Sequence, residues 1–287
     1  MTFEPKVSPR FVDQGVSEIL VEPNGDLVIG GSFGYLGDNE IGGFGKIYAD
    51  GTVAADFNSE NIIPTYSWVN SIIKAEDGGF IVSGYTYNPN VGFVYKYGPA
   101  GTLNSSFGDV IDLEYKNIQE TAIIGNKLVF GGTWSGGGYA NQSIPLHISN
   151  LDGTGYDDIS INATHENGFA YYSSLIKTGD DELIIGGYFE KINGLEKSGL
   201  VKVKLNGFID PAFDFDVEGS VSFIAKEDEQ NILVFGQFSK INNTDYFGAA
   251  RLKFFNNIPE VKAFNGSLSI QEDTPIDIHL PDFEIVD

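Results

Sequence analysis

The 287-residue chain contains no cysteine and only one methionine. Without cysteine there can be no disulfide bond, thiolate metal ligand or cysteine nucleophile. Long apolar runs are also missing, since no stretch approaches the roughly 20 residues of a membrane-spanning helix. Residues 1–20 show no apolar core of a signal peptide. We therefore expect no membrane insertion and no cysteine-based catalysis.

Positive charge is scarce. Lysine and arginine number 17 against 40 aspartates and glutamates, which gives a formal net charge of −23. Such a surface repels phosphate backbones and anionic lipids, so we expect no nucleic-acid partner. The 36 glycines and 13% aromatic content, with few helix-favouring runs, indicate a folded all-β chain with many tight turns.

A short signature of aliphatic residues, two small residues and an aromatic residue recurs along the chain. Its copies are Leu27–Phe33, Phe80–Thr86, Leu128–Trp134, Leu183–Phe189 and a shorter Leu233–Phe238. The last glycine falls at 31, 84, 132 and 187, with Gln237 in the fifth copy, so the steps are 84−31=53, 132−84=48, 187−132=55 and 237−187=50. A period of this size is typical of propellers and solenoids.

Each signature lies among three further strand patterns. In the first repeat these are Val16–Val21 before an Asn24-Gly25 turn, then Phe44–Tyr48, an Asp50-Gly51 turn and a closing segment that ends near Phe57. Four short strands in about 50 residues are typical of a propeller blade. The sequence therefore predicts a β-propeller of five four-stranded blades in residues 1–255. The predicted blades are residues 12–58, 59–108, 109–161, 162–216 and 217–255.

The fifth repeat lacks its fourth strand, because no Asp-Gly turn or closing Phe follows Phe254. A candidate for the missing strand lies at the N-terminus. The closing residue Phe57 precedes the first strand of the next repeat, at Val69, by 69−57=12 positions, and Phe3 precedes the first strand at Val16 by a similar 16−3=13 positions. We therefore predict that residues 1–11 supply the closing strand, with residues 2–7 paired to residues 249–254.

Residues 256–287 differ from the repeats. They carry seven acidic residues against one base, Lys262, and no copy of the signature. Apolar and polar residues alternate in Ser267–Ile270 and Ile276–Leu280, which predicts two strands of a β-sandwich. We interpret this segment as a linker and the start of a further immunoglobulin-like domain.

Two family resemblances follow from these patterns. Residues 1–254 resemble the delta-sixty β-propeller repeats of bacterial and phage proteins. The matching residues are Asn24-Gly25, Gly30-Gly31, Phe33, Asp50-Gly51 and Asp56-Phe57-Asn58. The tail resembles cadherin-like, immunoglobulin-like tandem domains at Asn257–Val261 and Glu272–Pro275. Both resemblances imply display on large multidomain surface or virion proteins, and neither implies a reaction.

The sequence gives little sign of catalysis. Its three histidines lie in different parts of the chain without metal-ligand spacing, and no G-x-S-x-G elbow occurs. We therefore predict that the protein is not an enzyme. One stretch resembles a Ca²⁺ loop, with candidate ligands Asn150, Asp152, Thr154 and Asp158. Ile161 stands where the bidentate glutamate belongs, and the stretch also aligns with ordinary blade turns, which is the reading we favour. No other cofactor is suggested.

The segments that follow the signatures vary in length and sequence, as recognition loops do on a repeating frame. They are residues 35–42, 87–91, 135–142, 191–197 and 240–246, and the topology predicts that they share one face. Their tyrosines are Tyr35, Tyr87, Tyr139 and Tyr246, with Asn, Gly and Asp around them. The alternative is plain hairpin loops with incidental tyrosines.

Taken together, these patterns predict a non-enzymatic structural and recognition module of a larger fibrous protein. Its partner would be a neighbouring protein subunit or a surface glycan. The first hypothesis is a phage tail or fibre component located in the virion. The alternative is an extracellular adhesin module on a bacterial cell surface, and a propeller glycosidase or lyase is the third.

Overall fold

The computed structural model describes residues 7–8, 15–57, 63, 67–87, 91–107, 113–114, 116–134, 144–254, 260–261 and 285–286. Every regular element in this part of the chain is a β-strand. Over these residues no helix is long and apolar enough to cross a membrane. The predicted all-β class is confirmed.

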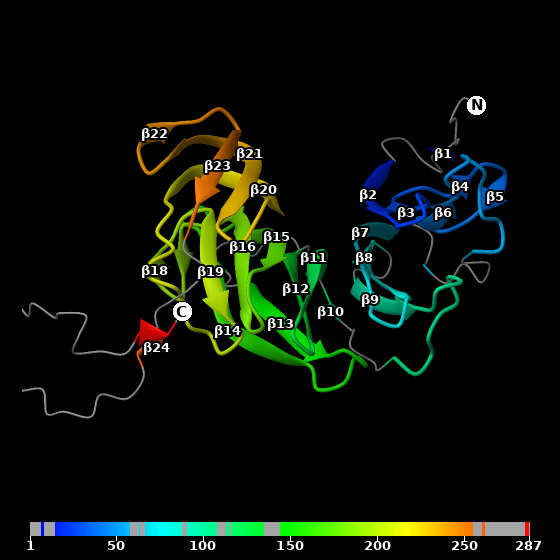
Figure 1. Ribbon diagram of the computed structural model, residues 1–287, viewed down its shortest axis with the longest axis horizontal. Coiled ribbons are helices and arrows are strands. Elements are labelled where there is room, and N and C mark those ends of the chain that lie inside the picture. Colours follow the sequence, from blue (N-terminus) through cyan, green and yellow to red (C-terminus); the bar gives the residue numbers. More distant parts are fainter. Residues whose placement is uncertain are drawn as a thin grey trace, which may run out of the picture.

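Five antiparallel sheets follow one another along the chain, one for each repeat (Figure 1). The first sheet contains β2 (Val16–Val21), β3 (Leu27–Gly31) and β6 (Phe44–Ile47). The second contains β7 (Ser67–Lys74), β8 (Phe80–Thr86), β9 (Val91–Tyr97) and β10 (Leu113–Glu114). The third contains β11 (Lys116–Ile124), β12 (Lys127–Trp134), β13 (Ile144–Asn150) and β14 (Asp157–Thr164). The fourth contains β15 (Tyr171–Lys177), β16 (Glu182–Tyr188) and β19 (Leu200–Lys204), and the fifth β20 (Val217–Lys226), β21 (Asn231–Ile241) and β23 (Ala249–Lys253).

The variable segments that the structure describes in full form small hairpins, as the alternative interpretation of these segments predicts. In the first repeat β4 (Tyr35–Leu36) pairs with β5 (Asn39–Glu40), and in the fourth β17 (Lys191–Ile192) pairs with β18 (Leu195–Glu196). In the fifth, β22 (Thr244–Asp245) pairs with the end of β21. The fourth-repeat hairpin turns at Asn193 and Gly194, both at positive φ. Residues 88–90 and 135–143, which cover most of two further variable segments, lie outside the described residues.

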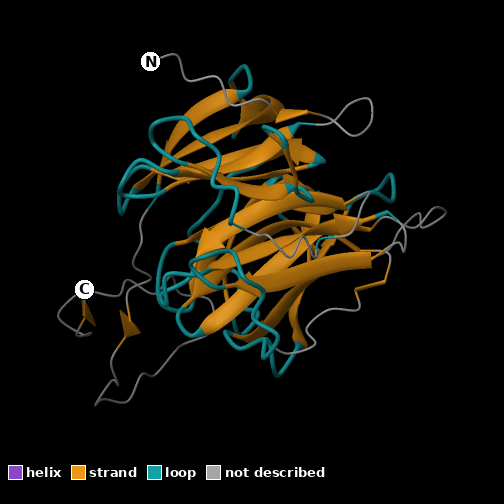
Figure 2. Ribbon diagram, turned by 90° about the vertical axis from the view of Figure 1, so that its right-hand side faces the viewer, coloured by secondary structure: helices purple, strands orange, loops and turns teal. Residues whose placement is uncertain are grey.

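Adjacent sheets pack face to face (Figure 2). Each signature strand has a hydrogen-bonded strand on both sides within its own sheet. Val69 and Ile72 of β7 pack into the core between the first and second sheets, together with Val28 of β3. Val221 and Ile224 of β20 pack in the same way against Ile184 of the fourth sheet. A strand that is buried on both faces must be apolar at consecutive positions, which explains the unbroken aliphatic run of the first four signatures.

The two small residues of the signature face different neighbours. A side chain at the second position would overlap the carbonyl oxygen of the first strand of the same sheet, as at Gly187 beside Tyr171. Each of these first strands carries a register shift near this position. The first position instead faces the next sheet, because a Cβ at Gly186 would lie 2.8 Å from Val221 Cγ1. The glycine pair therefore permits close approach in two directions, toward the first strand of its own sheet and toward the next sheet.

The fifth signature is shifted by one residue from the predicted alignment. Gly236 meets the carbonyl oxygen of Ser220, just as Gly187 meets that of Tyr171, so Gly236 takes the second position. The placement of Gln237 there was wrong. Phe235 consequently occupies the first position, where the other copies have Gly30, Ser83, Gly131 or Gly186.

Among the described residues, the outer faces of the first and fifth sheets carry exposed apolar side chains. Val16 and Ile19 of the first sheet are 39% and 54% exposed, although the equivalent Val69 and Ile72 are buried. At the other end Phe223 and Phe235 are 55% and 41% exposed. Closure of the ring therefore stays a prediction. Phe235 fills the place where a small residue admits the next sheet, so a sheet on this face would have to pack differently from the sheets that cover Gly30, Gly131 and Gly186.

Of the predicted closing strand at residues 1–11, residues 1–6 and 9–11 lie outside the described residues. β1 (Val7–Ser8) pairs with Leu36 and Tyr35 of the first repeat, and not with residues 249–254 as predicted for Val7. This pairing matches that of Ala163 and Thr164 with Ile192 and Lys191. β1 is thus equivalent to the end of β14, the fourth strand of the third sheet, relative to the hairpin of the next repeat. Pairing of residues 2–6 with the fifth sheet stays a prediction.

The segment after the fifth sheet is described at four residues. β24 (Glu260–Val261) pairs antiparallel with β25 (Ile285–Val286). Residues 255–259 and 262–284 lie outside the described residues, so the immunoglobulin-like domain stays a prediction.

Candidate functional site

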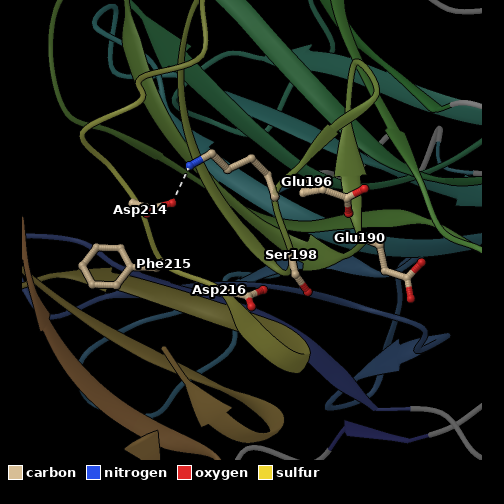
Figure 3. A pocket seen from close by; sticks show the side chains of 7 residues that line it. Glu190, Glu196, Ser198, Asp214, Phe215 and Asp216 are labelled. Carbon is tan, nitrogen blue, oxygen red and sulfur yellow. Dashed lines mark hydrogen bonds and ion pairs between the residues drawn. The ribbon is translucent and has the colours of Figure 1, made fainter. Parts of the chain in front are cut away.

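A pocket of about 480 Å³ opens beside the hairpin of the fourth repeat, one of the predicted recognition segments. One wall is this hairpin with its flanks, and the other is the segment that leads from the closing Phe213 into β20 (Figure 3). We call it the loop pocket. Its lining residues are Glu190, Glu196, Lys197, Ser198, Asp214, Phe215 and Asp216.

Hydrogen bonds hold the two walls of the loop pocket together. Lys197 Nζ donates to Asp214 Oδ1 at 2.9 Å and to the carbonyl oxygen of Phe213 at 3.3 Å. Ser198 Oγ donates to the carbonyl oxygen of Val217 at 2.7 Å. From the fifth repeat, the Asn242 side chain accepts from the Asp216 N–H and donates to the carbonyl oxygen of Asp214. The pocket is therefore built across the boundary between two repeats.

The loop pocket is acidic, with four carboxylates and a single ammonium group in its lining. Glu196 also pairs with Lys191 Nζ at 2.5 Å, and this hydrogen bond raises the pKa of Lys191. Glu190 accepts a hydrogen bond from the Glu166 N–H and lies 3.4 Å from His165 Nε2. With Phe215 as an aromatic wall, this lining favours a cationic group.

Sequence reasoning found only part of this pocket. Residues 191–197 were predicted as a recognition segment, and Glu196 was among its acids. Asp214 and Asp216 were missed because they follow the closing Phe213 and were interpreted as part of the blade frame. Their signal was the alternation of acid and aromatic in Phe213-Asp214-Phe215-Asp216.

The three described tyrosines of the predicted recognition segments differ in exposure. Tyr87 is 65% exposed, whereas Tyr35 is half-buried within a hairpin and Tyr246 packs against the core of the fifth repeat. Tyr139 lies outside the described residues. None of the described three lines the loop pocket.

The Ca²⁺ candidates form an ordinary turn. Asp152 Oδ1 accepts hydrogen bonds from the Thr154 N–H and hydroxyl, and Asp50 accepts the same pair from Thr52 in the first repeat. Asn150 Oδ1 accepts from Lys127 Nζ at 2.7 Å, so a cationic side chain already lies there. Asp158 instead contacts His147 Nδ1 at 2.5 Å. Over the described residues, no three His, Asp or Glu side chains form a group that could hold a metal ion.

Two glutamates on the first strands of their sheets have raised pKa values. Burial raises the pKa of Glu120 to about 7, although Ser71 Oγ donates to its Oε1 at 2.8 Å. The Glu18 carboxylate raises the pKa of Glu120 further, and burial raises the pKa of Glu18 itself. Perturbed carboxylates can mark functional sites, but here they lie at the junction of the first three sheets, which also fits a packing role.

Comparisons with known proteins address the fold alone. A family model described as "Domain of unknown function (DUF5122) beta-propeller" matches residues 178–213, which include β16 to β19. The solved structure of YCF48 from Cyanidioschyzon merolae is 13% identical, with a TM-score of 0.44 over 87% of this chain and 72% of that chain. No curated protein matches the chain. The family match and the five repeated sheets together support a β-propeller repeat protein.

Proposed function

We propose that this chain is a non-enzymatic recognition module of a larger fibrous protein, and that the loop pocket binds a cationic group of its partner. The observation that carries this proposal is the acidic lining of a pocket built on a variable hairpin. A lysine or arginine side chain of a protein subunit supplies such a group, whereas a neutral glycan does not. The setting that we propose is a virion tail or fibre, with a bacterial surface adhesin as the alternative.

The test is binding of oligo-arginine to the full chain by titration calorimetry, with oligo-glutamate of equal length and a neutral oligosaccharide as comparison ligands. We expect the triple variant Glu190→Gln, Glu196→Gln and Asp216→Asn to weaken oligo-arginine binding by about tenfold or more. Asp214 is left in place because it pairs with Lys197.

The matched control removes three negative charges elsewhere, by Asp56→Asn, Glu76→Gln and Asp180→Asn. These residues do not line the loop pocket and are exposed. An equal loss of binding in the control variant would mean that only the overall negative charge attracts the peptide. Preference for the oligosaccharide, with no effect of the pocket variant, would also contradict the proposal.

A further inference from the structure

The outward face of the fifth sheet differs from the same face of the other sheets at the first signature position. In three of the other four sheets this position is glycine, in close contact with the following sheet. A Cβ at Gly30 would lie 2.5 Å from Val69 Cγ1, and one at Gly186 would lie 2.8 Å from Val221 Cγ1. Phe235 stands at this position in the fifth sheet. A first strand therefore cannot approach this face as β7 and β20 approach theirs without displacing the ring.

A second phenylalanine lies beside Phe235 on the same face. Phe223 pairs with Phe235 across the sheet, just as Ser174 pairs with Gly186, and the two rings lie 6.3 Å apart. The other sheets have polar residues at the position of Phe223, which are Glu18, Ser71, Glu120 and Ser174. Two adjacent positions of the fifth sheet have therefore become aromatic where the other sheets are small or polar.

A third phenylalanine extends this surface. Phe247 precedes Gly248 as Ser198 precedes Gly199, and the two glycines have equivalent backbone hydrogen bonds. The Ser198 hydroxyl donates to the carbonyl oxygen of Val217 at 2.7 Å, so a side chain at this position reaches toward the following repeat. Phe247 has the same place in the fifth repeat and is 95% exposed.

Leu233 completes the surface. It pairs with Arg251 as Ile184 pairs with Lys202, and it is half-buried although Ile184 is fully buried. We call Phe223, Leu233, Phe235 and Phe247 the aromatic face. A contiguous exposed apolar patch on a folded protein usually marks a contact, and aromatic residues are enriched at the centres of protein interfaces.

Charge indicates which partner this surface fits. Residues 217–254 carry five acidic and four basic side chains, a net charge of 4−5=−1 in a chain of −23. Three of the four bases already pair within the repeat: Lys226 with Glu229, Lys240 with Glu218, and Arg251 with Glu227. Residues 15–57 at the other end of the series carry seven acids against one base, or 1−7=−6. The repulsion between two copies is therefore weakest where their fifth repeats meet.

We propose that the aromatic face binds the aromatic face of a second copy of this chain. A surface without a free charge of one sign is complementary to itself, and phenylalanine rings pack well against one another. The first sheet fits less well as the partner, because its repeat is more acidic and Phe235 obstructs a first strand such as β2. Contact of one patch with the same patch has twofold symmetry and is complete at two copies.

Sedimentation equilibrium of the full chain at several concentrations tests the proposal. We expect a reversible equilibrium of monomer and dimer without larger species. The variant Phe223→Ser with Phe247→Ser introduces the serines that the fourth repeat has at these positions. It should raise the dimer dissociation constant at least about tenfold. Circular dichroism checks its folding, and Phe247→Ser alone, at a side chain with almost no burial, should shift the constant in the same direction.

The matched control removes two exposed apolar side chains from the first sheet, by Ile19→Ser with Val21→Ser. These residues lie at the other end of the series of sheets (Figure 1). The control variant should form the dimer with an unchanged dissociation constant, because the first sheet takes no part in the proposed contact.

Four results would overturn the proposal. A chain that stays monomeric at every concentration does not use the aromatic face for self-association. Species that grow beyond the dimer would indicate a head-to-tail contact that does not close. An equal loss of dimer in the control variant would assign the other side of the contact to the first sheet. A dimer that the phenylalanine variants leave unchanged would use another surface.

Discussion

The two small residues of the signature are under different constraints, although they are adjacent in the sequence. The second glycine has no space for a side chain, because a Cβ at Gly187 would overlap the Tyr171 carbonyl oxygen of the neighbouring strand. The first position depends on the next sheet, so it varies where that sheet varies. Ser83 fits there because its hydroxyl lies 2.6 Å from that of Thr121.

We expect Gly187→Ala to lower the free energy of unfolding by about 2 kcal/mol, because the added methyl group must displace backbone atoms. Urea unfolding followed by circular dichroism measures the change. The comparison is Phe235→Ala, which removes a partly exposed ring from a position with no sheet against it. A larger loss for Phe235→Ala than for Gly187→Ala would contradict this account.

Glu120 makes stability depend on pH. Its pKa is raised from 4.5 to about 7 in the folded protein, mainly by burial. The folded protein therefore binds the proton more tightly than the unfolded chain. Its contribution is complete below pH 4.5 and is lost as the pH rises through about 7.

We expect Glu120→Gln to remove most of this loss, so that the variant gains up to about 3 kcal/mol over the parent at pH 8 and little at pH 4. Glutamine keeps an acceptor for the Ser71 hydroxyl. Chemical unfolding at several pH values tests this expectation, with Glu76→Gln as an exposed control. Parallel pH profiles for parent and Glu120→Gln would refute it.

Residues of the candidate site were predicted better from the variation of their segment than from their residue type. Glu196 lay in a segment that variation had already marked, and the structure places it in the loop pocket. Tyr35 and Tyr246 were chosen for their chemistry, but half-buried tyrosines also stabilise hairpins and cores. A tyrosine that binds a partner must be exposed, whereas a tyrosine that stabilises a hairpin or core is buried. Exposure depends on packing between repeats, which cannot be determined from a single sequence.

Elements were predicted well where a repeated pattern and a turn signal coincided. The structure confirms β2, β3 and β6 and the turns at Gly25 and Gly51, which both adopt positive φ. The described hairpins of the variable segments agree with the alternative of plain hairpin loops, but the bounds of their strands were not predicted because strands of two residues have no periodicity. Their signal was the turn residues, such as Asn193-Gly194.

The first strand offers a test at this scale. We predict that residues 2–6 continue from β1 as the fourth strand of the fifth sheet, beside β23, because β1 pairs with β4 as β14 pairs with β17. Deletion of residues 1–10 would expose the edge of β23 and lower the melting temperature by several degrees. Scanning calorimetry of the full chain and the deletion variant makes the measurement. An unchanged melting temperature would show that no such strand supports the fifth sheet.

For the whole molecule, the period of the signature was enough to predict a stack of similar sheets. It was not enough to predict how the stack ends, because a period describes only what the repeats share. The ends are set by exceptions, and Phe235 is the clearest of them. The one-residue error at Gln237 arose because the fifth copy keeps only one glycine of the pair, and Gly236 was assigned to the first position instead of the second.

The pairing of β14 with β17 has a further consequence for how such arrays can be edited. Ala163 and Val217 occupy equivalent places, because Ala163 pairs with Ile192 in the hairpin of the fourth repeat and Val217 pairs with Ile241 in the hairpin of the fifth. Removing residues 163–216 would therefore join two ends that already have the same local geometry. The number of sheets is then a modular property that insertion or excision can change one unit at a time, while the last unit keeps its own terminal surface.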